Sequence, residues 1–525
     1  MLHTFEKNET LDLCRPQASH GSAWLSACTT ARVNAVAVAV AGRRHPCPLP
    51  EETTPCRVFR VATARVGQDE RVLEVKVVPR PLAALAAVLT QGQAARFRLA
   101  AERAATVLSG RVVWNVSSTA AGGGVAEMLR TLLGYVAGAG VATRWLVLAG
   151  DPAFFAITKR LHNAIHGMGD GAALGAAEHE HYTSVLRGNL AELLDRVGRD
   201  DLVLLHDPQP AGLLEPLRRA GIRVIWRSHI GRDVPNESSV MGWEFLRRYV
   251  ESADAFVFSR RQYAPPWVPS DRLWVIPPSI DPVSAKNRPI AAEDCVRILT
   301  RAGMLSADGR AGSALVQGAP APSADARLVV QVSRWDRLKD MRGVLVAFSR
   351  ISPPVDDARL MLVGPAVAGV SDDPEGAEVL AECLAAWRTL PAGARDRVHL
   401  VSVPMNDPTE NATIVNAIQR HASVVTQKSL VEGFGLTVAE AMWKARPVVA
   451  SAVGGIQEQI IDGRSGILVP DPTDLDAFGH AVRRVLADDQ LARALGQAAH
   501  LRIRDQFLGD RHLGQYAELF AAVVS

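Results

Sequence analysis

The sequence lacks the patterns that mark several classes of small or metal-bound protein. Its six cysteines include no CxxC pair and have no histidine nearby at the spacing of a zinc site. Free thiols in a reducing compartment are therefore expected, rather than a zinc module or a disulfide framework. Aromatic residues make up only 5% of the chain, and alanine and valine carry most of its apolar content.

Long runs of one charge and long apolar runs are also missing. The formal net charge is +3 without any extended lysine and arginine stretch, which argues against a nucleic-acid partner. The longest early apolar run, ARVNAVAVAVAG, spans about a dozen residues and is too short to cross a membrane. The charged residues Glu6, Lys7 and Glu9, with no suitable cleavage site, disfavour a secretory signal. We therefore expect a cytoplasmic protein that binds no membrane.

Length and composition set the scale of the fold. A chain of 525 residues exceeds what one core usually supports and predicts about two to four domains. Its 48% hydrophobic and 22% charged residues are typical of a globular protein. Residues 1–60 lack sustained periodicity and include PCPLPEETTPC, which predicts a poorly ordered N-terminal extension.

Beyond residue 60, short β-branched runs alternate with longer amphipathic stretches. The strand VLEVKVVP and the helical stretch PLAALAAVLTQGQAARFRLAAERAATVL are followed by the strands RVVWNV, TRWLVLAG, DLVLLHD and RVIWRSH, with helices among them. The composition changes at residues 301–326, which predict an exposed loop or linker. The alternation then restarts at RLVVQVS, and a helical run from about Gln490 to Val524 is expected to close the second half.

This alternation predicts an α/β chain with two doubly wound, Rossmann-like halves on parallel sheets. The expected boundaries are 61–285 for the N-terminal domain and 286–500 for the C-terminal domain, followed by a C-terminal helix over 501–525. Ligands of such sheets bind at the carboxyl ends of the strands, so a cleft between the halves is the expected site.

Three glycines, residues 122–124, follow a strand in WNVSSTAAGGGVAEMLR and precede a helix. Bare glycines let a ligand approach the backbone, and a helix start offers N–H groups and positive partial charge to a phosphate or a sugar oxygen. The stretch is neither GxGxxG nor a Walker A loop. Taken alone, a purely structural turn is an equal alternative.

Two cations, Arg334 and Lys339, follow the strand that opens the second half, in QVSRWDRLKD. Arginine offers a planar bidentate donor and lysine a compact charge, so both could face a diphosphate. Solvated surface cations are the plainer interpretation of such a pair, but its place at a strand end favours a ligand.

The stretch SLVEGFGLTVAEAMWKARPVVAS, residues 429–451, holds Glu432 and Glu440 on either side of a tight turn. Gly433 and Gly435 allow a sharp strand-to-helix turn, which aims the first helical amides into the cleft. Glu432 is suited to sugar hydroxyls, and Glu440, farther along the helix, to ribose hydroxyls. The amides at the turn and helix start belong to Phe434, Gly435, Leu436 and Thr437.

Together these motifs resemble a known family. EGFGLTVAE, with the two cations and the glycines, is similar to the retaining glycosyltransferases of family four, which have the GT-B fold. Longer stretches resemble the trehalose glycosyltransferring synthases and, more distantly, the retaining trehalose phosphorylases. These stretches, from about residue 70 onward, are WNVSSTAAGGGVAEMLR, HDPQPAGL, VIWRSHI, PPSIDPVSAKN, SDDPEG and EGFGLTVAEAMWKARPVV.

The resemblance implies that glucose is transferred from a nucleoside diphosphate glucose, either ADP- or UDP-glucose, to free glucose, giving α,α-trehalose. It places the acceptor in the first half and the donor in the second, with no required cofactor. By the same resemblance, Arg334 and Lys339 bind the diphosphate, Glu432 the donor glucose and Glu440 the ribose. Of these, Glu432, Arg334 and Lys339 are the expected catalytic residues. Further implied contacts are Gly123, Gly124 and His229 to the donor and Asp207 to the acceptor.

Two positions depart from the family pattern. Gly231 stands where an acid tends to follow the His-Ile pair, which bears on acceptor contacts. Asp340 stands where a glycine commonly follows the lysine, which places an acid beside the predicted phosphate site.

No side-chain nucleophile accompanies the motifs, and the family is thought to use same-face substitution, with the leaving phosphate assisting the acceptor. Asp474-Leu475-Asp476 resembles a metal motif but is better explained as a helix cap, so no metal is expected. Phosphorolysis of trehalose and a non-catalytic sugar-binding protein are the alternatives. Nucleotide preference and oligomeric state stay open, a homodimer being one option.

Overall fold

The computed structural model describes residues 72–120, 123–169, 174–306, 312–351, 355, 357–367 and 375–525. The expected extension over residues 1–60 lies outside the described residues, and so does Gly122. All described residues belong to one compact unit, Val66–Ser525. None of the described helices is both long enough and apolar enough to cross a membrane.

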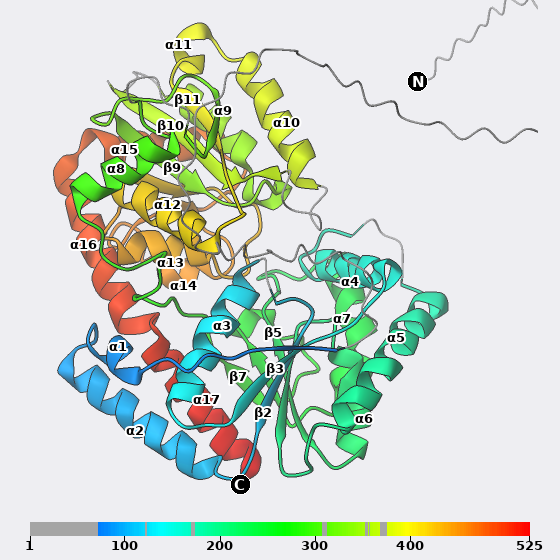
Figure 1. Cartoon of the computed structure of the whole chain (residues 1–525). Helices are drawn as coiled ribbons and strands as arrows, with labels where there is room; N and C mark the ends of the chain where they lie inside the picture. Colours follow the sequence, from blue (N-terminus) through cyan, green and yellow to red (C-terminus); the bar gives the residue numbers. More distant parts are fainter. Residues whose placement is uncertain are drawn as a thin grey trace, which may run out of the picture. The chain divides into compact units, whose positions relative to one another are not determined.

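Seven strands form the first sheet in the described part of the chain, in the order β1-β3-β2-β4-β5-β6-β7 (Figure 1). Neighbouring strands are parallel except at the edge, where β1 runs antiparallel to β3. The strands are β1 Leu73–Val75, β2 Val113–Ser117, β3 Thr143–Val147, β4 Leu202–His206, β5 Arg223–Ser228, β6 Ala255–Phe258 and β7 Leu273–Val275.

The central strands of this sheet are buried on both faces, which explains the apolar runs of β4 and β6, while β5 also buries Arg227 and Ser228. Alternate residues point to opposite sides, so Val203 and Leu205 join one core while Leu202 and Leu204 join another. The first core is covered by α4 Pro152–Ile165, α5 Ala176–Leu194 and α7 Glu237–Val250, and the second by α2 Gln91–Val107, α3 Gly123–Gly138 and α17 Gly509–Val524. Short helices are α1 Leu82–Ala86 and α6 Leu214–Arg219.

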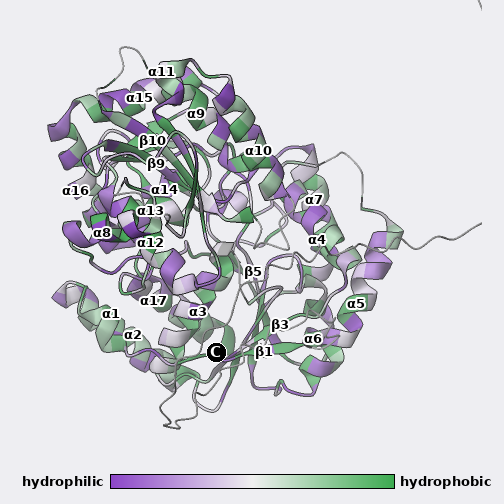
Figure 2. Ribbon diagram, turned by 45° about the horizontal axis from the view of Figure 1, so that its top comes forward, coloured by the Kyte–Doolittle hydropathy of each residue, from purple (hydrophilic) through white to green (hydrophobic). Residues whose placement is uncertain are grey.

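The second sheet also has seven strands within the described residues, in the order β14-β13-β12-β9-β10-β11-β8. Its pairs are parallel except β8, which runs antiparallel to β11. Figure 2 shows that β9 and β10 are largely hydrophobic, whereas the helices around them mix hydrophobic and hydrophilic stretches. The strands are β8 Leu315–Gly318, β9 Arg327–Val332, β10 Ala358–Pro365, β11 Val398–Val403, β12 Val424–Gln427, β13 Val448–Ser451 and β14 Ile467–Val469.

Helices lie on both faces of this sheet and separate two cores. The core that contains Val330 and Val425 is covered by helices from α8, α12, α13 and α16, and the core that contains Val329 and Val424 by α9, α10 and α15. The helix bounds are α8 Ala292–Ala302, α9 Met341–Ser349, α10 Glu375–Arg388, α11 Ala392–Arg395, α12 Pro408–His421, α13 Leu436–Trp443, α14 Ile456–Gln459, α15 Leu475–Ala487 and α16 Asp489–Gln506.

The predicted architecture of two Rossmann-like halves is confirmed, but both sheets are mixed rather than wholly parallel. The linker predicted over 301–326 contains the edge strand β8, whose Val316 pairs with Val401. The helical stretch predicted before Arg111 is divided into α1 and α2, because Thr90 and Gln93 form a reciprocal capping box that starts a new helix.

The end of the chain also differs from the expected single helical run. Helix α16 stops at Gln506, where the Phe507 carbonyl accepts a hydrogen bond from the Ile280 amide. Helix α17 then lies beside α2, and its Tyr516 and Leu519 pack against the first sheet rather than closing the second (Figure 1). The domain boundaries at 285/286 and 500/501 stay predictions.

Candidate functional site

The two predicted cations follow β9 at the carboxyl edge of the second sheet. Arg334 donates to the Asp336 carboxylate over 2.8 Å and keeps 49% of its side chain exposed. Asp336 also accepts from the Leu338 amide and so caps a short 3₁₀ turn, η3 Arg337–Lys339. Lys339 is the last residue of this turn, so the capped turn determines where its side chain lies.

Lys339 and Glu432 form an ion pair in which both side chains are mostly buried. The Lys339 Nζ lies 2.7 Å from Glu432 Oε2, and the Ser429 hydroxyl donates to the same oxygen over 3.1 Å. The two residues follow β9 and β12, which are neighbouring parallel strands. The sheet therefore brings together a cation and an acid that the sequence assigns to one ligand.

The Asp340 departure has a local explanation. Its backbone is left-handed, with φ of 42°, which suits glycine and which aspartate tolerates better than most residues. Its carboxylate accepts from the Gly343 amide over 2.9 Å, capping α9, and also bonds the buried Lys428 ammonium. The acid is thus paired, and it does not add an uncompensated negative charge beside Lys339.

Helix α13 begins without a side-chain cap. Its N-cap is Gly435, whose φ of 88° requires a residue without Cβ, and no side chain bonds the first amides of the helix. Phe434 is buried against Phe507 at 5.8 Å between ring centroids, and the Thr437 hydroxyl donates to Gln427 over 2.9 Å. These contacts hold the turn, and the amides at Leu436 and Thr437 stay suited to an anion.

Glu440 occupies an environment separate from that of Glu432. It is 4% exposed, and its Oε1 lies 3.7 Å from the Lys286 Nζ. Its Oε2 has no hydrogen-bond partner in the part of the chain that the structure describes. Burial raises the pKa of Glu440, and Lys286 opposes that rise. The two acids of the motif are therefore not an acid/base pair acting on one atom.

The glycine-rich turn of the first half lies against this helix. Helix α3 begins at Gly123, and a Cβ on Gly124 would lie 2.9 Å from Leu436 Cδ1 at the start of α13. Gly122 is outside the described residues. The starts of α3 and α13 thus come together, and both offer N–H groups and positive partial charge.

His229 lies at the end of β5, and both of its ring nitrogens are bonded inside the first half. Arg227 Nε donates to His229 Nδ1 over 3.1 Å, so His229 Nε2 carries the proton and donates to His206 over 3.0 Å. Burial holds the pKa of both histidines well below the usual range. To contact the sugar donor, His229 would have to replace one of these hydrogen bonds by a bond to the ligand. This contact stays a prediction.

Asp207 is strained and partly buried at the end of β4. Its φ is 66°, and its carboxylate accepts from the His229 amide over 2.7 Å. Burial raises the pKa of Asp207 to about 7, although the His229 amide and Arg227 oppose that rise. A backbone outlier with a perturbed acid is typical of functional positions, and the acceptor role stays a prediction.

Two residues that contact the glutamates of the motif were not predicted from the sequence. Tyr263, just after β6, donates its hydroxyl to the carbonyls of Glu432 over 3.0 Å and Gly433 over 2.7 Å. A Cβ on Gly231 would lie 2.4 Å from the Tyr263 ring, so glycine at this position makes room for the tyrosine. The other such residue is Lys286, whose Nζ lies 3.7 Å from Glu440 Oε1. Tyr263 and Lys286 lie in the segments that come after β6 and β7, and this position on the carboxyl side of the sheet was the available signal.

The structure supports the cap interpretation of Asp474-Leu475-Asp476. Asp474 is the N-cap of α15 and accepts from the Ala477 amide over 2.8 Å. Within the described ranges, no three residues among His, Cys, Asp and Glu gather as a metal site would require. Cys295 and Cys383 are buried free thiols, and the other four cysteines lie outside the described residues.

Known proteins resemble this chain over both halves. Residues 115–265 match the family described as "Trehalose synthase, N-terminal domain", and residues 318–502 match "Glycosyl transferases group 1". The trehalose synthase of Pyrococcus horikoshii is 35% identical over 419 residues, covering 78% of this chain and 90% of that protein. The trehalose synthase of Rubrobacter xylanophilus is 36% identical over 427 residues, covering 79% and 92%.

More distant proteins share part of the sequence or the fold alone. The trehalose phosphorylase of Pleurotus pulmonarius is 25% identical over 414 residues, covering 74% of this chain and 54% of that protein. The solved sucrose-phosphate synthase of Thermosynechococcus elongatus has a TM-score of 0.57 at 21% identity, covering 78% of this chain and 100% of that one. The UDP-forming α,α-trehalose-phosphate synthase of Burkholderia xenovorans has a TM-score of 0.60 at 16% identity. This match covers 79% of this chain and 100% of that one.

These solved relatives share the GT-B arrangement of two facing α/β sheets. The match to the synthases covers most of both chains, and the match to the group 1 family spans the segments that contain Lys339, Glu432 and Glu440. This chain belongs to the trehalose synthase family of group 1 glycosyltransferases.

Proposed function

We propose that this protein transfers glucose from a nucleoside diphosphate glucose to free glucose and so makes α,α-trehalose. The observation that carries the proposal is the ion pair of Lys339, in the turn after β9, with Glu432, in the loop that precedes the uncapped start of α13. This arrangement supplies positive charge for a diphosphate and a carboxylate for sugar hydroxyls. The 35% and 36% identity to trehalose synthases supports trehalose as the product.

The proposed donor site extends over both halves. Arg334 and Lys339 bind the diphosphate with the first amides of α13, while Glu432 binds the glucose and Glu440 the ribose. The glycine start of α3 contacts the phosphates from the opposite side, and Asp207 and His229 lie on the sugar side of the first half. The amides and glycines assigned to the donor are those of Phe434, Gly435, Leu436, Thr437, Gly123 and Gly124.

The configuration of the anomeric carbon is retained because the acceptor hydroxyl attacks the same face of the sugar from which the leaving group departs. The bond between the anomeric carbon and the diphosphate oxygen breaks, and the acceptor hydroxyl oxygen forms the new glycosidic bond. The acceptor proton passes to the departing phosphate oxygen. Lys339, Arg334 and the helix amides stabilise the charge that develops on the diphosphate, which is a preorganised electrostatic contribution.

We expect this chemistry to need no divalent metal, because cations and helix amides already face the diphosphate. Activity that persists in EDTA would support this expectation. Activity that EDTA abolishes and magnesium restores would contradict it. The cytoplasmic location predicted from the sequence stays a prediction.

Product analysis tests the proposal directly. The purified protein is incubated with ADP-, UDP- or GDP-glucose and free glucose, each with and without inorganic phosphate. We expect trehalose with at least one nucleotide sugar, independent of phosphate, and the comparison identifies the preferred nucleotide. No trehalose from any of them would contradict the proposal.

The same assay separates the two alternatives. Phosphate-dependent release of glucose 1-phosphate from trehalose, without nucleotide, would indicate a phosphorylase, the activity named for the relative with 25% identity. Binding of sugar without turnover in either direction would indicate a non-catalytic protein. If Arg334→Ala left turnover unchanged, the assignment of the site would be wrong even though the activity was right.

A further inference from the structure

The segment PPSIDPVSAKN, residues 277–287, contains Lys286, a residue to which the proposed function assigns no role. It follows β7 and precedes α8, so it carries the chain from the first sheet to the second. The Asp281 carboxylate accepts from Arg80 over 2.5 Å and from the Tyr135 hydroxyl over 3.1 Å. The Asn287 amide donates to the Asp281 carbonyl over 3.0 Å. The backbone beside Lys286 is therefore held firmly.

Lys286 lies between two carboxylates from different elements. Its Nζ is 2.7 Å from Glu127 Oε2 on α3 and 3.7 Å from Glu440 Oε1 on α13. The side chains are 19% exposed for Lys286, 50% for Glu127 and 5% for Glu440. The lysine thus links the glycine-started helix of the first half to the buried acid of the second.

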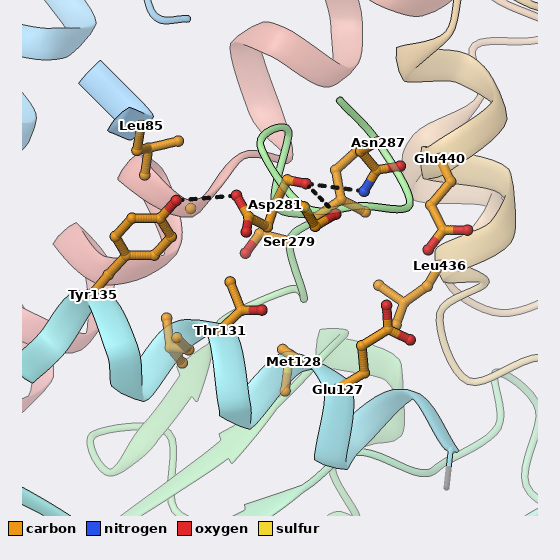
Figure 3. A pocket seen from close by; sticks show the side chains of 14 residues that line it. Leu85, Glu127, Met128, Thr131, Tyr135, Ser279, Asp281, Asn287, Leu436 and Glu440 are labelled. Carbon is orange, nitrogen blue, oxygen red and sulfur yellow. Dashed lines mark hydrogen bonds between the residues drawn. The ribbon is translucent and has the colours of Figure 1, made fainter. Parts of the chain in front are cut away.

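Glu440 presents its Oε1 to this lysine and lines a pocket beside it. The pocket is lined by Glu127, Asn287 and Glu440 among others. Figure 3 shows Glu127 on α3 and Glu440 on α13 reaching toward the same opening. The Glu440 Oε2 is buried and has no hydrogen-bond partner among the described residues, although a buried carboxylate oxygen normally accepts a hydrogen bond. A ligand hydroxyl would supply the missing donor.

Among the described residues, the cation that contacts the Glu440 carboxylate is Lys286. Lys444, the residue that follows the last residue of α13, is also buried, but its ammonium donates to Asn287 Oδ1, Gln419 Oε1 and the Glu440 backbone carbonyl. Burial raises the pKa of Glu440, and Lys286 is the largest influence that opposes it. Without Lys286, the acid would hold its proton to a higher pH.

We propose that Lys286 is a positioning residue for donor binding, which keeps Glu440 ionised and turns its Oε2 toward the ribose hydroxyls of the nucleotide sugar. The proposal rests on the proposed function, because the ribose belongs to that donor. An ionised carboxylate accepts hydrogen bonds at both oxygens, whereas a protonated carboxyl group carries an O–H donor that itself needs an acceptor. Charge-assisted bonds of this kind are the stronger ones.

Binding of two ligands tests the role. Calorimetry compares wild-type protein with Lys286→Met, using the nucleoside diphosphate that binds most tightly, ADP or UDP, and inorganic pyrophosphate, which has no ribose. We expect Lys286→Met to weaken nucleoside diphosphate binding about tenfold or more, as for loss of a bond to a charged group. Pyrophosphate binding should change less than about twofold, because the phosphate contacts are intact.

The pH dependence supplies a readout that a merely structural lysine would not move. The charged groups that face Glu440 are Lys286, Glu127 and Lys444, and Asp281 lines the same pocket. Lys286→Met raises the pKa of Glu440, so the acid limb of binding moves to higher pH. Glu127→Gln removes a negative neighbour and moves that limb the other way. Lys286→Arg should restore the wild-type profile.

The outcomes separate this proposal from the proposed function. A Lys286→Met protein that binds both ligands as wild type does, or loses both equally, overturns the role of Lys286 alone. Wild-type protein that binds the nucleoside diphosphate but makes no trehalose overturns the proposed function alone, and one that binds no nucleoside diphosphate overturns both. In a Glu440→Gln background, a further loss with Lys286→Met would also overturn the role. Lys286→Gln replaces Lys286→Met if thermal melting shows that the latter is unfolded.

Discussion

At the scale of single residues, Lys339 and Glu432 depend on each other. Lys339→Ala leaves the Glu432 carboxylate mostly buried without the cation now 2.7 Å away, and it removes a charge from the proposed phosphate site. We expect kcat/KM for trehalose formation to fall by about two to three decades, as on loss of one preorganised donor. Steady-state kinetics with the preferred nucleotide sugar checks this.

The matched control lies in the same turn. Arg337 is half-exposed and pairs with Glu375, Glu378 and Glu382 on the surface of α10. Because exposed ion pairs contribute little, Arg337→Ala should change kcat/KM less than about threefold. Equal losses in the two variants would show that charge in this region, and not the Lys339 site, matters.

The raised pKa of Asp207 predicts how the stability of the fold depends on pH. Its pKa is raised to about 7 in the folded protein, so the folded state holds this proton where the unfolded state has released it. Stability should therefore fall as pH rises toward about 7, by up to about 1.4 kcal/mol per pH unit. Asp207→Asn keeps a side chain that tolerates φ of 66°, and it should flatten this part of the profile. Urea titrations from pH 5 to 8 compare the two proteins, and parallel profiles would refute the prediction.

At the scale of elements, the start of α3 lies against the start of α13, where Gly124 approaches Leu436. The added methyl of Gly124→Ala would lie 2.9 Å from Leu436 Cδ1, the far end of a flexible side chain that can move. Alanine also favours a helix by about 0.5 to 1 kcal/mol, so stability should change by less than about 1 kcal/mol. The displaced Leu436 disturbs the first amides of α13, and the KM for the donor should rise about tenfold.

A second helical glycine supplies the comparison. A Cβ on Gly188 in α5 would meet no atom within 4 Å. Gly188→Ala should therefore leave the donor KM unchanged while keeping the same gain in helix preference. An unchanged KM in Gly124→Ala would mean that the contact between α3 and α13 does not influence donor binding.

At the scale of the whole molecule, Tyr263 connects the first sheet to the donor loop of the second. Tyr263→Phe keeps the ring against Gly231 but removes the hydroxyl from the carbonyls of Glu432 and Gly433. The Gly433 carbonyl keeps its bond from the Gly455 amide, but the Glu432 carbonyl loses its donor, which should lower the free energy of unfolding by about 1–3 kcal/mol. The loop that carries Glu432 also loses its anchor, so the donor KM should rise.

The control removes a hydroxyl remote from the donor loop. Tyr249 on α7 bonds His179 within the first half over 2.6 Å. Tyr249→Phe should lower stability by a comparable amount without raising the donor KM. A donor KM that stays at the wild-type value in Tyr263→Phe would show that this hydroxyl only stabilises the fold.

Particular elements show where sequence reasoning succeeds and where it stops. Strands β4 and β9 were predicted because a parallel strand buried on both faces needs a continuous apolar run. The edge strand β1 lies inside the predicted strand VLEVKVVP, whereas β8 was expected to be a loop, because β8 is short and partly exposed and its pairing with β11 is decided by distant residues. The helicity of α17 was predicted, but not its return to the first sheet, because periodicity does not identify the partner of an apolar face.

The sequence by itself determined the alternation of strands and helices, the turns at Gly124 and Gly435, and the residue types that suit a diphosphate and sugar hydroxyls. These depend on local backbone freedom, periodicity and side-chain chemistry. Only the tertiary structure decided that Glu432 pairs with Lys339 while Glu440 pairs with Lys286. Which charges meet depends on strand order and on the crossover between the sheets, and residues far apart in the chain determine both.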